Sequence, residues 1–173
     1  MSDTSLRTLV LARHARAEKE GATDAARELS AQGHADSGAM GRLLLRAGYR
    51  FGAVVSSPAR RTRQTWSGIQ ATGITADKVR FDRRVYDGDP AALLDVLAEI
   101  PERVRSLLVI GHAPTIPELA DLLADPEASD AAALEKLRSS FPSGCLAVLT
   151  LEEPWAALAP GIATLSEVTT PRD

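Results

Sequence analysis

The sequence contains a single cysteine, Cys145, among 173 residues. One thiol cannot form a disulfide within the chain, and the scarcity of cysteine is typical of a reducing compartment. Cys145 lies in the apolar stretch Gly144-Cys145-Leu146-Ala147-Val148-Leu149. We therefore expect it to be a small buried side chain of a strand and not a nucleophile.

Long apolar runs and an excess of basic charge are also missing. No apolar run approaches the roughly 20 residues that span a membrane, and residues 6–12 are too short and too interrupted for a signal-peptide core. The 20 lysines and arginines against 23 aspartates and glutamates give a formal net charge of -3. We expect a cytoplasmic protein with no nucleic acid or membrane partner, in which any bound anion is held by a local cluster of cations.

The remaining composition is that of an ordinary folded domain. Hydrophobic residues make up 45% and charged residues 25% of the chain, which predicts one domain over residues 1–173. Alternation of apolar runs with helical periodicity predicts an α/β fold, a three-layer α/β/α sandwich with a mainly parallel central sheet. The expected strands are 6–12, 51–55, 79–81, 107–110, 145–151 and 162–168, the last two forming a hairpin-like edge. The expected helices are 35–47, 58–71, 91–99, 117–124 and 131–137, and residues 13–33 and 82–90 are expected to be mostly loop.

Three of the expected strands end in the same kinds of residue. Arg13 and His14 follow the first strand, and Gly111-His112-Ala113 follows the strand at 107–110. The second strand runs into Ser57-Pro58, where we expect Ser57 to cap a helix and Pro58 to lie in its first turn. That helix carries the three arginines Arg60, Arg61 and Arg63. If the strands are parallel, these residues meet at the carboxyl edge of the sheet, where ligands of such folds bind.

This combination of residues is suited to a phosphoryl group. Arginine forks and a helix N-terminus bind phosphate oxygens. A neutral imidazole is a competent nucleophile toward phosphorus, and nearby arginines keep it neutral. A second imidazole, if protonated, can donate to the oxygens in the transition state. No metal is expected, because the histidines are not paired at helical spacing and no cluster of cysteines or aspartates accompanies them.

At these motifs the chain resembles the histidine phosphatase superfamily, which is phosphoglycerate mutase-like in fold. The three signatures are Leu9-Val10-Leu11-Ala12-Arg13-His14-Ala15, Ser57-Pro58-Ala59-Arg60-Arg61-Thr62-Arg63-Gln64-Thr65 and Ile110-Gly111-His112-Ala113-Pro114. The short chain, the run from Arg13 to Glu18, Leu29-Ser30-Ala31-Gln32-Gly33, and Val85-Tyr86-Asp87 resemble the SixA type, a phosphohistidine phosphatase.

The resemblance implies a role for each matching residue and requires no cofactor. His14 would be the nucleophile that becomes phosphorylated. Arg13, Arg61, His112 and Ala113 would bind the phosphate, whereas Arg60 and Arg63 do not match and are expected at the rim or in solvent. Ala15 replaces the glycine usual in the superfamily, as it does in SixA-like members, and would be strained if its φ were positive.

The general acid is the open position in this scheme. Asp87, Asp89 and Glu18 are the candidates, and Asp87 is placed with the catalytic residues because it follows Tyr86 ahead of a helix. Asp87 and Asp89 fit equally well as turn and capping residues before Pro90. A missing acid would favour phosphoramidate substrates, because an imidazole leaves phosphorus with little help whereas an alkoxide needs a proton.

The expected function is therefore hydrolysis of phosphohistidine in a protein, through a phosphoenzyme. The alternatives are a small-molecule phosphomonoesterase and a phosphoprotein-binding module without chemistry, and a mutase is the weakest candidate for a chain of this length. Outside the motifs, His34 is expected to be a solvated surface residue. Trp66, Tyr49 and Trp155 are expected to pack in the interior.

Overall fold

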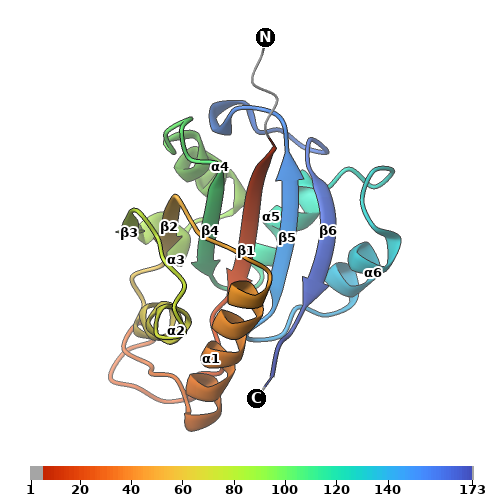
Figure 1. Cartoon of the computed structure of the whole chain (residues 1–173). Coiled ribbons are helices and arrows are strands. Elements are labelled where there is room, and N and C mark those ends of the chain that lie inside the picture. The colour runs from red at the N-terminus through yellow and green to blue at the C-terminus, as the bar shows by residue number, and fades with distance from the viewer. Residues whose placement is uncertain (1–5, 173) are drawn as a thin grey trace.

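A six-stranded mixed sheet forms the middle of the computed structural model, which describes residues 6–172 (Figure 1). The strands are β1 (Arg7–Arg13), β2 (Ala53–Ser56), β3 (Val79–Phe81), β4 (Ser106–Gly111), β5 (Leu146–Leu151) and β6 (Thr164–Thr169), in the order β3-β2-β4-β1-β5-β6. The first four strands of that order are parallel, and β5 and β6 are antiparallel to their neighbours. The predicted fold class is confirmed, including the hairpin-like edge at β5 and β6.

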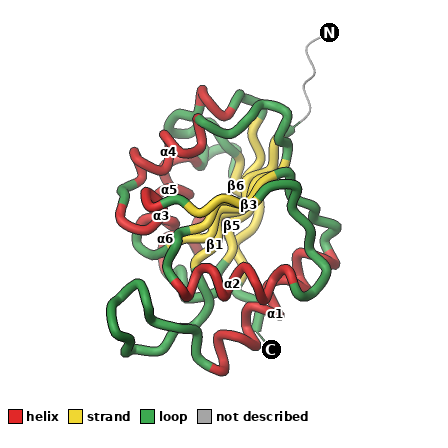
Figure 2. Tube along the Cα trace, turned by 90° about the vertical axis from the view of Figure 1, so that its left-hand side faces the viewer, coloured by secondary structure: helices red, strands yellow, loops and turns green. Residues whose placement is uncertain are grey.

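Helices cover both faces of the sheet, as Figure 2 shows edge-on. One face carries α1 (Ala31–Arg46) and α2 (Arg60–Gln70). The other carries α3 (Arg83–Asp87), α4 (Pro90–Ala98), α5 (Thr115–Leu123) and α6 (Ala131–Ser139), and a 3-10 turn (Trp155–Ala157) follows β5. Each face has its own apolar cluster because successive strand residues alternate: Leu9 and Leu11 of β1 pack under α4 and α5, and Val10 and Ala12 pack under α1 and α2.

Pairing in the parallel part of the sheet brings the predicted strand ends together. Arg13 lies opposite Gly111, and Ser56 lies opposite Ile110. Backbone hydrogen bonds continue this register past the strands, since His14 N–H donates to the carbonyl of Gly111 at 3.0 Å and Ser57 N–H to that of Ile110 at 3.0 Å. The residues after β1, β2 and β4 therefore share one edge.

The helices differ from the prediction at several starts, and α5 begins at Thr115, two residues earlier than expected. α1 begins at Ala31 and not at residue 35, because the Ser30 hydroxyl accepts from Gly33 N–H at 3.0 Å and caps it. α2 begins at Arg60, with Ala59 as its N-cap and Pro58 outside the helix. The Ser57 hydroxyl instead faces the site described below. Residues 82–90 are not only loop: α3 forms there because Asp82 accepts from Arg84 N–H at 2.9 Å.

The aromatic and surface expectations hold. Trp66 and Trp155 are buried, Tyr49 packs against the cluster on the α1 side, and His34 is exposed on α1. Cys145 is a free and buried thiol. No helix within residues 6–172 is long and apolar enough to cross a membrane.

Arg172, the last residue that the structure describes, is bound beside α1. Arg172 donates to the carboxylate of Asp36 at 3.1 Å and to the carbonyl of Ser143 at 3.0 Å. Asp36 has no exposed surface, so Arg172 supplies a charge partner that a buried carboxylate needs. Ser143 belongs to the turn before β5, which also borders the first strand end.

Candidate active site

Two imidazoles face each other at the carboxyl edge of the parallel strands. His14 follows β1 and His112 follows β4, and their ring centroids are 5.3 Å apart. Arg13 and Arg61 flank them from β1 and from the first turn of α2. The four residues that the sequence motifs singled out therefore lie in one cluster.

His14 is held in one orientation by its own backbone. Its Nδ1 lies 2.6 Å from the carbonyl oxygen of Ala15. A carbonyl only accepts, so Nδ1 carries the proton and Nε2 keeps its lone pair. Burial, and then the positive charges nearby, lower the pKa of His14 to about 3. The imidazole is neutral near neutral pH, as a nucleophile must be.

Ala15 causes no strain at this turn. No residue other than glycine has a positive φ within residues 6–172, so the position tolerates a side chain. Ala15 is fully buried, and its N–H donates to the Thr65 hydroxyl of α2 at 3.0 Å. The hydrogen bond joins the turn after β1 to the helix that carries Arg61.

His112 is polarised from both sides. Arg61 Nη2 lies 3.3 Å from its Nδ1, and a guanidinium can only donate. The other nitrogen, Nε2, therefore carries the proton and donates to the Ser57 hydroxyl at 2.8 Å. Burial, followed by the charge of Arg61, lowers the pKa of His112 to about 4. His112 becomes a cationic donor only if a negative group such as a phosphoryl is added beside it.

In both arginines, Nη1 of the guanidinium is held by a backbone carbonyl, and at least one N–H group has no protein partner within residues 6–172. Arg61 is 6% exposed and donates through Nη1 to the Asp24 carbonyl at 2.8 Å. Arg13 donates through Nη1 to the Phe141 carbonyl at 3.0 Å. The Nε of each is buried without a hydrogen-bond partner in the described part of the chain. Each guanidinium carries five N–H donors, more than the hydrogen bonds just described use, so two such cations in one cluster with the imidazoles favour an anionic ligand.

Asp24 belongs to the site although the sequence analysis did not select it. Its carboxylate accepts from the Tyr86 hydroxyl at 2.7 Å, from Arg27 at 3.0 Å and from Arg61 at 3.1 Å. The hydrogen bond from Tyr86, and then those from the arginines, hold the pKa of Asp24 well below its usual range. Asp24 sits in an irregular loop with no periodicity, so only the Asp24-Ala25-Ala26-Arg27 spacing could have indicated it.

Tyr86 completes the wall that Asp24 begins. Its ring stands edge-on to the ring of His112, with centroids 5.5 Å apart and an angle of 80°. The hydroxyl reaches Asp24, and the ring reaches His112. The short helix α3 is thus part of the site.

The three proposed acids lie outside this cluster of contacts. Asp87 ends α3, and its half-exposed carboxylate accepts from Arg83 at 3.0 Å. Asp89 caps α4 by accepting from Ala92 N–H at 2.9 Å, as the capping interpretation predicts. Glu18 is exposed in the loop after β1.

The two unmatched arginines are engaged elsewhere. Arg60 pairs with Glu28 at 2.9 Å, and Arg63 stacks its guanidinium over the ring of Phe81 at 3.8 Å. Both are exposed. Beyond His112, Ala113 is exposed at the rim of an open cavity of about 410 Å³ that reaches Phe141 and α6.

No group of three or more histidine, cysteine, aspartate or glutamate side chains within residues 6–172 is arranged to hold a metal ion. Arg13 and Arg61 bring positive charge to both imidazoles, and the Asp24 carboxylate pairs with Arg61. The arrangement is suited to binding a tetrahedral anion against a neutral imidazole.

Known proteins resemble this chain in sequence and in fold. Residues 9–85 match the model of the histidine phosphatase superfamily (branch 1). A solved structure of a candidate phosphohistidine phosphatase SixA from Nakamurella multipartitia is 36% identical. It covers 96% of this chain and 97% of its own length, with a TM-score of 0.86.

Two further matches extend the comparison. An uncharacterized protein of Mycobacterium tuberculosis (strain H37Rv) is 35% identical over 92% of this chain and 99% of its own length. The protein histidine phosphatase SixA, solved in complex with tungstate, is 22% identical, with a TM-score of 0.77 over 95% of this chain and 97% of its own. At that identity the likeness is one of fold.

Proposed function

Because this chain belongs to the histidine phosphatase superfamily and is of the SixA type, we propose that it hydrolyses phosphohistidine in a protein, with His14 as the nucleophile. The observation that carries the proposal is the orientation of His14. Its Nδ1–H is tied to the Ala15 carbonyl at 2.6 Å, which leaves the lone pair of Nε2 for attack on phosphorus.

The first step transfers the phosphoryl group to the enzyme. Nε2 of His14 forms a bond to phosphorus as the bond from phosphorus to the substrate nitrogen breaks. The substrate ring, which carries a proton on its other nitrogen, takes that electron pair and leaves as neutral imidazole. The guanidinium groups of Arg13 and Arg61 bind the phosphoryl oxygens. His112 takes up a proton as the dianion arrives and then donates to the same oxygens.

The second step returns His14 to its starting state. Water attacks the phosphorus of phosphohistidine 14 as the bond to Nε2 breaks, and phosphate leaves as H2PO4−, which retains both protons of the water. The protonated His112, whose ring lies 5.3 Å from that of His14, stabilises the negative oxygens during this step and loses its proton when phosphate departs.

Phosphohistidine fits this site better than an alkyl phosphate does. An alkoxide must be protonated as it leaves, whereas an imidazole is a better leaving group. Asp24 reaches the cluster through Arg61 and Tyr86, but its low pKa keeps it ionised, and Asp87 is bound to Arg83. The site thus offers a phosphoryl-binding cluster without a carboxylic acid poised to donate.

Replacement of His14 tests the mechanism. We expect His14→Ala to lower turnover of a phosphohistidine protein and of phosphoramidate by at least about 1000-fold, because the nucleophile is removed. His34→Ala is the matched control, since that imidazole is exposed on α1. Trapping 32P on the wild-type protein, and its loss in the His14 variant, would show the intermediate directly.

The substrate class needs a separate comparison. We expect the wild-type kcat/KM for a phosphohistidine protein to exceed that for an alkyl phosphate of similar size. Equal values, together with a large loss for the alkyl phosphate alone in Asp87→Asn, would favour the small-molecule phosphomonoesterase instead. If the His14 variant kept wild-type turnover, both the phosphohistidine phosphatase and the phosphomonoesterase hypotheses would be contradicted, because each requires His14 as the nucleophile.

A further inference from the structure

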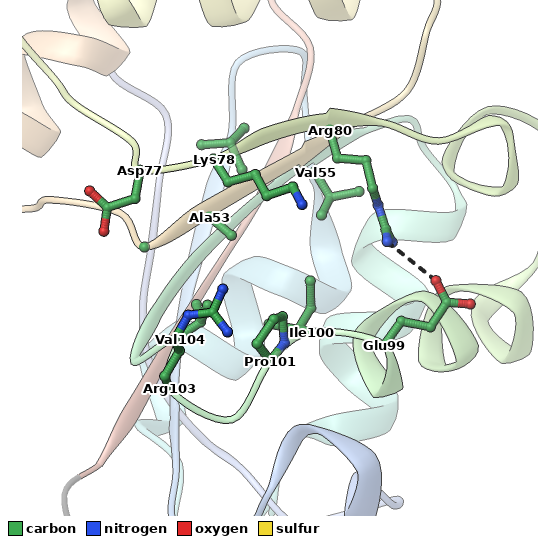
Figure 3. A pocket seen from close by; sticks show the side chains of 12 residues that line it. Ala53, Val55, Asp77, Lys78, Arg80, Glu99, Ile100, Pro101, Arg103 and Val104 are labelled. Atoms are coloured by element: carbon green, nitrogen blue, oxygen red, sulfur yellow. Dashed lines mark hydrogen bonds and ion pairs between the residues drawn. The ribbon is translucent and has the colours of Figure 1, made fainter.

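A second cavity lies at the end of the sheet opposite the histidines, beside the edge strand β3 (Figure 3). Its lining comes from the start of β2, from β3 and from the connection between α4 and β4. Since β2 runs from Ala53 in the cavity to Ser56 at the active-site edge, the two sites lie at opposite ends of the parallel strands. The volume of about 400 Å³ falls within the range of small-ligand sites.

The floor of this cavity is apolar. Ala53 and Val55 of β2 present their side chains on the same face of the sheet, and Ile100 and Val104 approach from the connection after α4 (Figure 3). All four are at least 90% buried. A ligand here would rest on carbon atoms already packed in the core.

Three cations surround the floor. Lys78 and Arg80 come from the β3 side and Arg103 from the opposite side, and Figure 3 shows their side chains directed toward the cavity. Lys78 and Arg103 make no ion pair in the part of the chain that the structure describes. Arg80 is held by Glu99 at 3.3 Å and Asp82 at 3.4 Å, yet its Nε is buried without a hydrogen-bond partner.

The two acidic residues of the lining do not cancel these charges. The Glu99 carboxylate accepts from Arg84 at 2.8 Å and 2.9 Å, besides its contact with Arg80. The Asp77 carboxylate points away from the middle of the cavity in Figure 3. The inner surface therefore joins an apolar floor to a surplus of positive charge.

We propose that this cavity binds a small organic anion, whose head group lies between Lys78 and Arg103 and whose apolar or aromatic body lies on the floor of Ala53, Val55 and Val104. Charge complementarity selects the head group. The cavity size and its carbon floor select the body. Binding here is independent of the phosphatase reaction, because none of the lining residues belongs to the histidine cluster.

The test is an amide NMR titration of the full chain with 2-naphthoate. We expect saturable shifts confined to residues 52–55, 77–80 and 99–104. Acetate has the charge without the body, and 2-naphthalenemethanol has the body without the charge. We expect each of them to bind at least about tenfold more weakly than 2-naphthoate, since one of the two contacts is lost.

Paired variants separate the cavity from general charge effects. Lys78→Gln with Arg103→Gln should weaken 2-naphthoate about tenfold or more. Arg46→Gln with Lys136→Gln removes the same charge from exposed positions on α1 and α6 and should leave the affinity unchanged. Shifts only around His14 and His112, equal affinity in the two double variants, or no saturation would each overturn the proposal.

Discussion

At the residue scale, Asp24 fixes the orientation of the Arg61 guanidinium through two hydrogen bonds. Arg61 gives both terminal nitrogens to Asp24, Nη1 to its carbonyl and Nη2 to its carboxylate. The geometry leaves Nε of Arg61 as the donor without a partner. Asp24 is therefore a positioning residue that acts through Arg61, and its carboxylate also holds Tyr86 in the wall of the site.

Two substitutions separate the geometry of Asp24 from its charge. We expect Asp24→Ala to raise KM about tenfold, because Arg61 loses a charge-assisted hydrogen bond. Asp24→Asn keeps an oxygen acceptor and should stay within about threefold of wild type. Steady-state kcat and KM, with the Kd of inorganic phosphate from calorimetry, would measure both effects.

The control for these variants is Glu20→Gln, which removes one negative charge from the same exposed loop and should change neither constant. Tighter phosphate binding in Asp24→Ala would show that the carboxylate mainly repels the anion. Equal losses in the alanine and asparagine variants would show that charge, not hydrogen-bond geometry, is what Arg61 requires.

At the scale of elements, the short helix α3 is stabilised by charged side chains at its start. Asp82 caps it through Arg84 N–H and also accepts from the Arg84 guanidinium at 2.8 Å. Arg84 then reaches Glu99 after α4 at 2.8 Å. These contacts fix the helix that carries Tyr86.

Removal of the Asp82 cap should loosen the helix. We expect Asp82→Ala to lower the free energy of unfolding by about 1 to 2 kcal/mol and to raise KM, because Tyr86 loses its support. Asp82→Asn caps nearly as well and should recover most of the KM. Urea unfolding would measure the loss of stability, and amide hydrogen exchange within residues 83–87 would measure the loosening of α3. Unchanged exchange in Asp82→Ala would argue against a role of Asp82 in stabilising this helix.

The motifs predicted the elements of the sheet better than they predicted its connections. Arg13, His14 and His112 could be placed because each directly follows a buried strand, and parallel pairing puts such ends together. Asp24 and α3 depend on contacts between residues far apart in the chain, such as Tyr86 to Asp24. No local pattern encodes those contacts. The antiparallel direction of β5 beside β1 was equally hidden, because an apolar run does not reveal the direction of its neighbour.

At the scale of the whole molecule, the two site imidazoles make stability depend on pH. Their folded pKa values are about 3 for His14 and about 4 for His112, below the value of roughly 6.5 in an unfolded chain. The unfolded state therefore binds more protons in the interval between these values. Stability is full above about pH 6.5 and falls as the pH is lowered, by up to about 1.4 kcal/mol per pH unit for each histidine.

Urea unfolding at about pH 7 and about pH 5 would measure this dependence, in a range where most carboxylates remain ionised. We expect His14→Gln to reduce the loss in free energy of unfolding between about pH 7 and about pH 5, because one buried imidazole is removed. The exposed His34→Gln should leave the loss unchanged, and phosphate should reduce it by favouring protonated His112. A wild-type stability that is the same at both pH values would contradict the burial of neutral imidazoles.

Arg172 links the segment after β6 to α1 and to the turn before β5. We expect Arg172→Ala to lower the free energy of unfolding by about 2 kcal/mol, because the buried Asp36 loses a charged donor. Gln32 still donates to Asp36 at 2.8 Å, which limits the loss. Urea unfolding would measure this loss. Arg172→Lys keeps the positive charge without the planar guanidinium, so its free energy of unfolding should lie between those of the wild type and of Arg172→Ala.

The position of Arg172 also bears on how the protein is best handled in the laboratory. The contact with Ser143 places Arg172 at the carboxyl end of the parallel strands, whereas β1 begins at the opposite end of the sheet (Figure 1). The turn that accepts from Arg172 at Ser143 also contains Gly144, whose N–H donates to the carbonyl of His14 at 2.9 Å. An affinity tag or fluorescent protein appended after Asp173 would lie close to this turn and crowd the approach to the histidine cluster. The same tag placed ahead of β1 would leave both undisturbed.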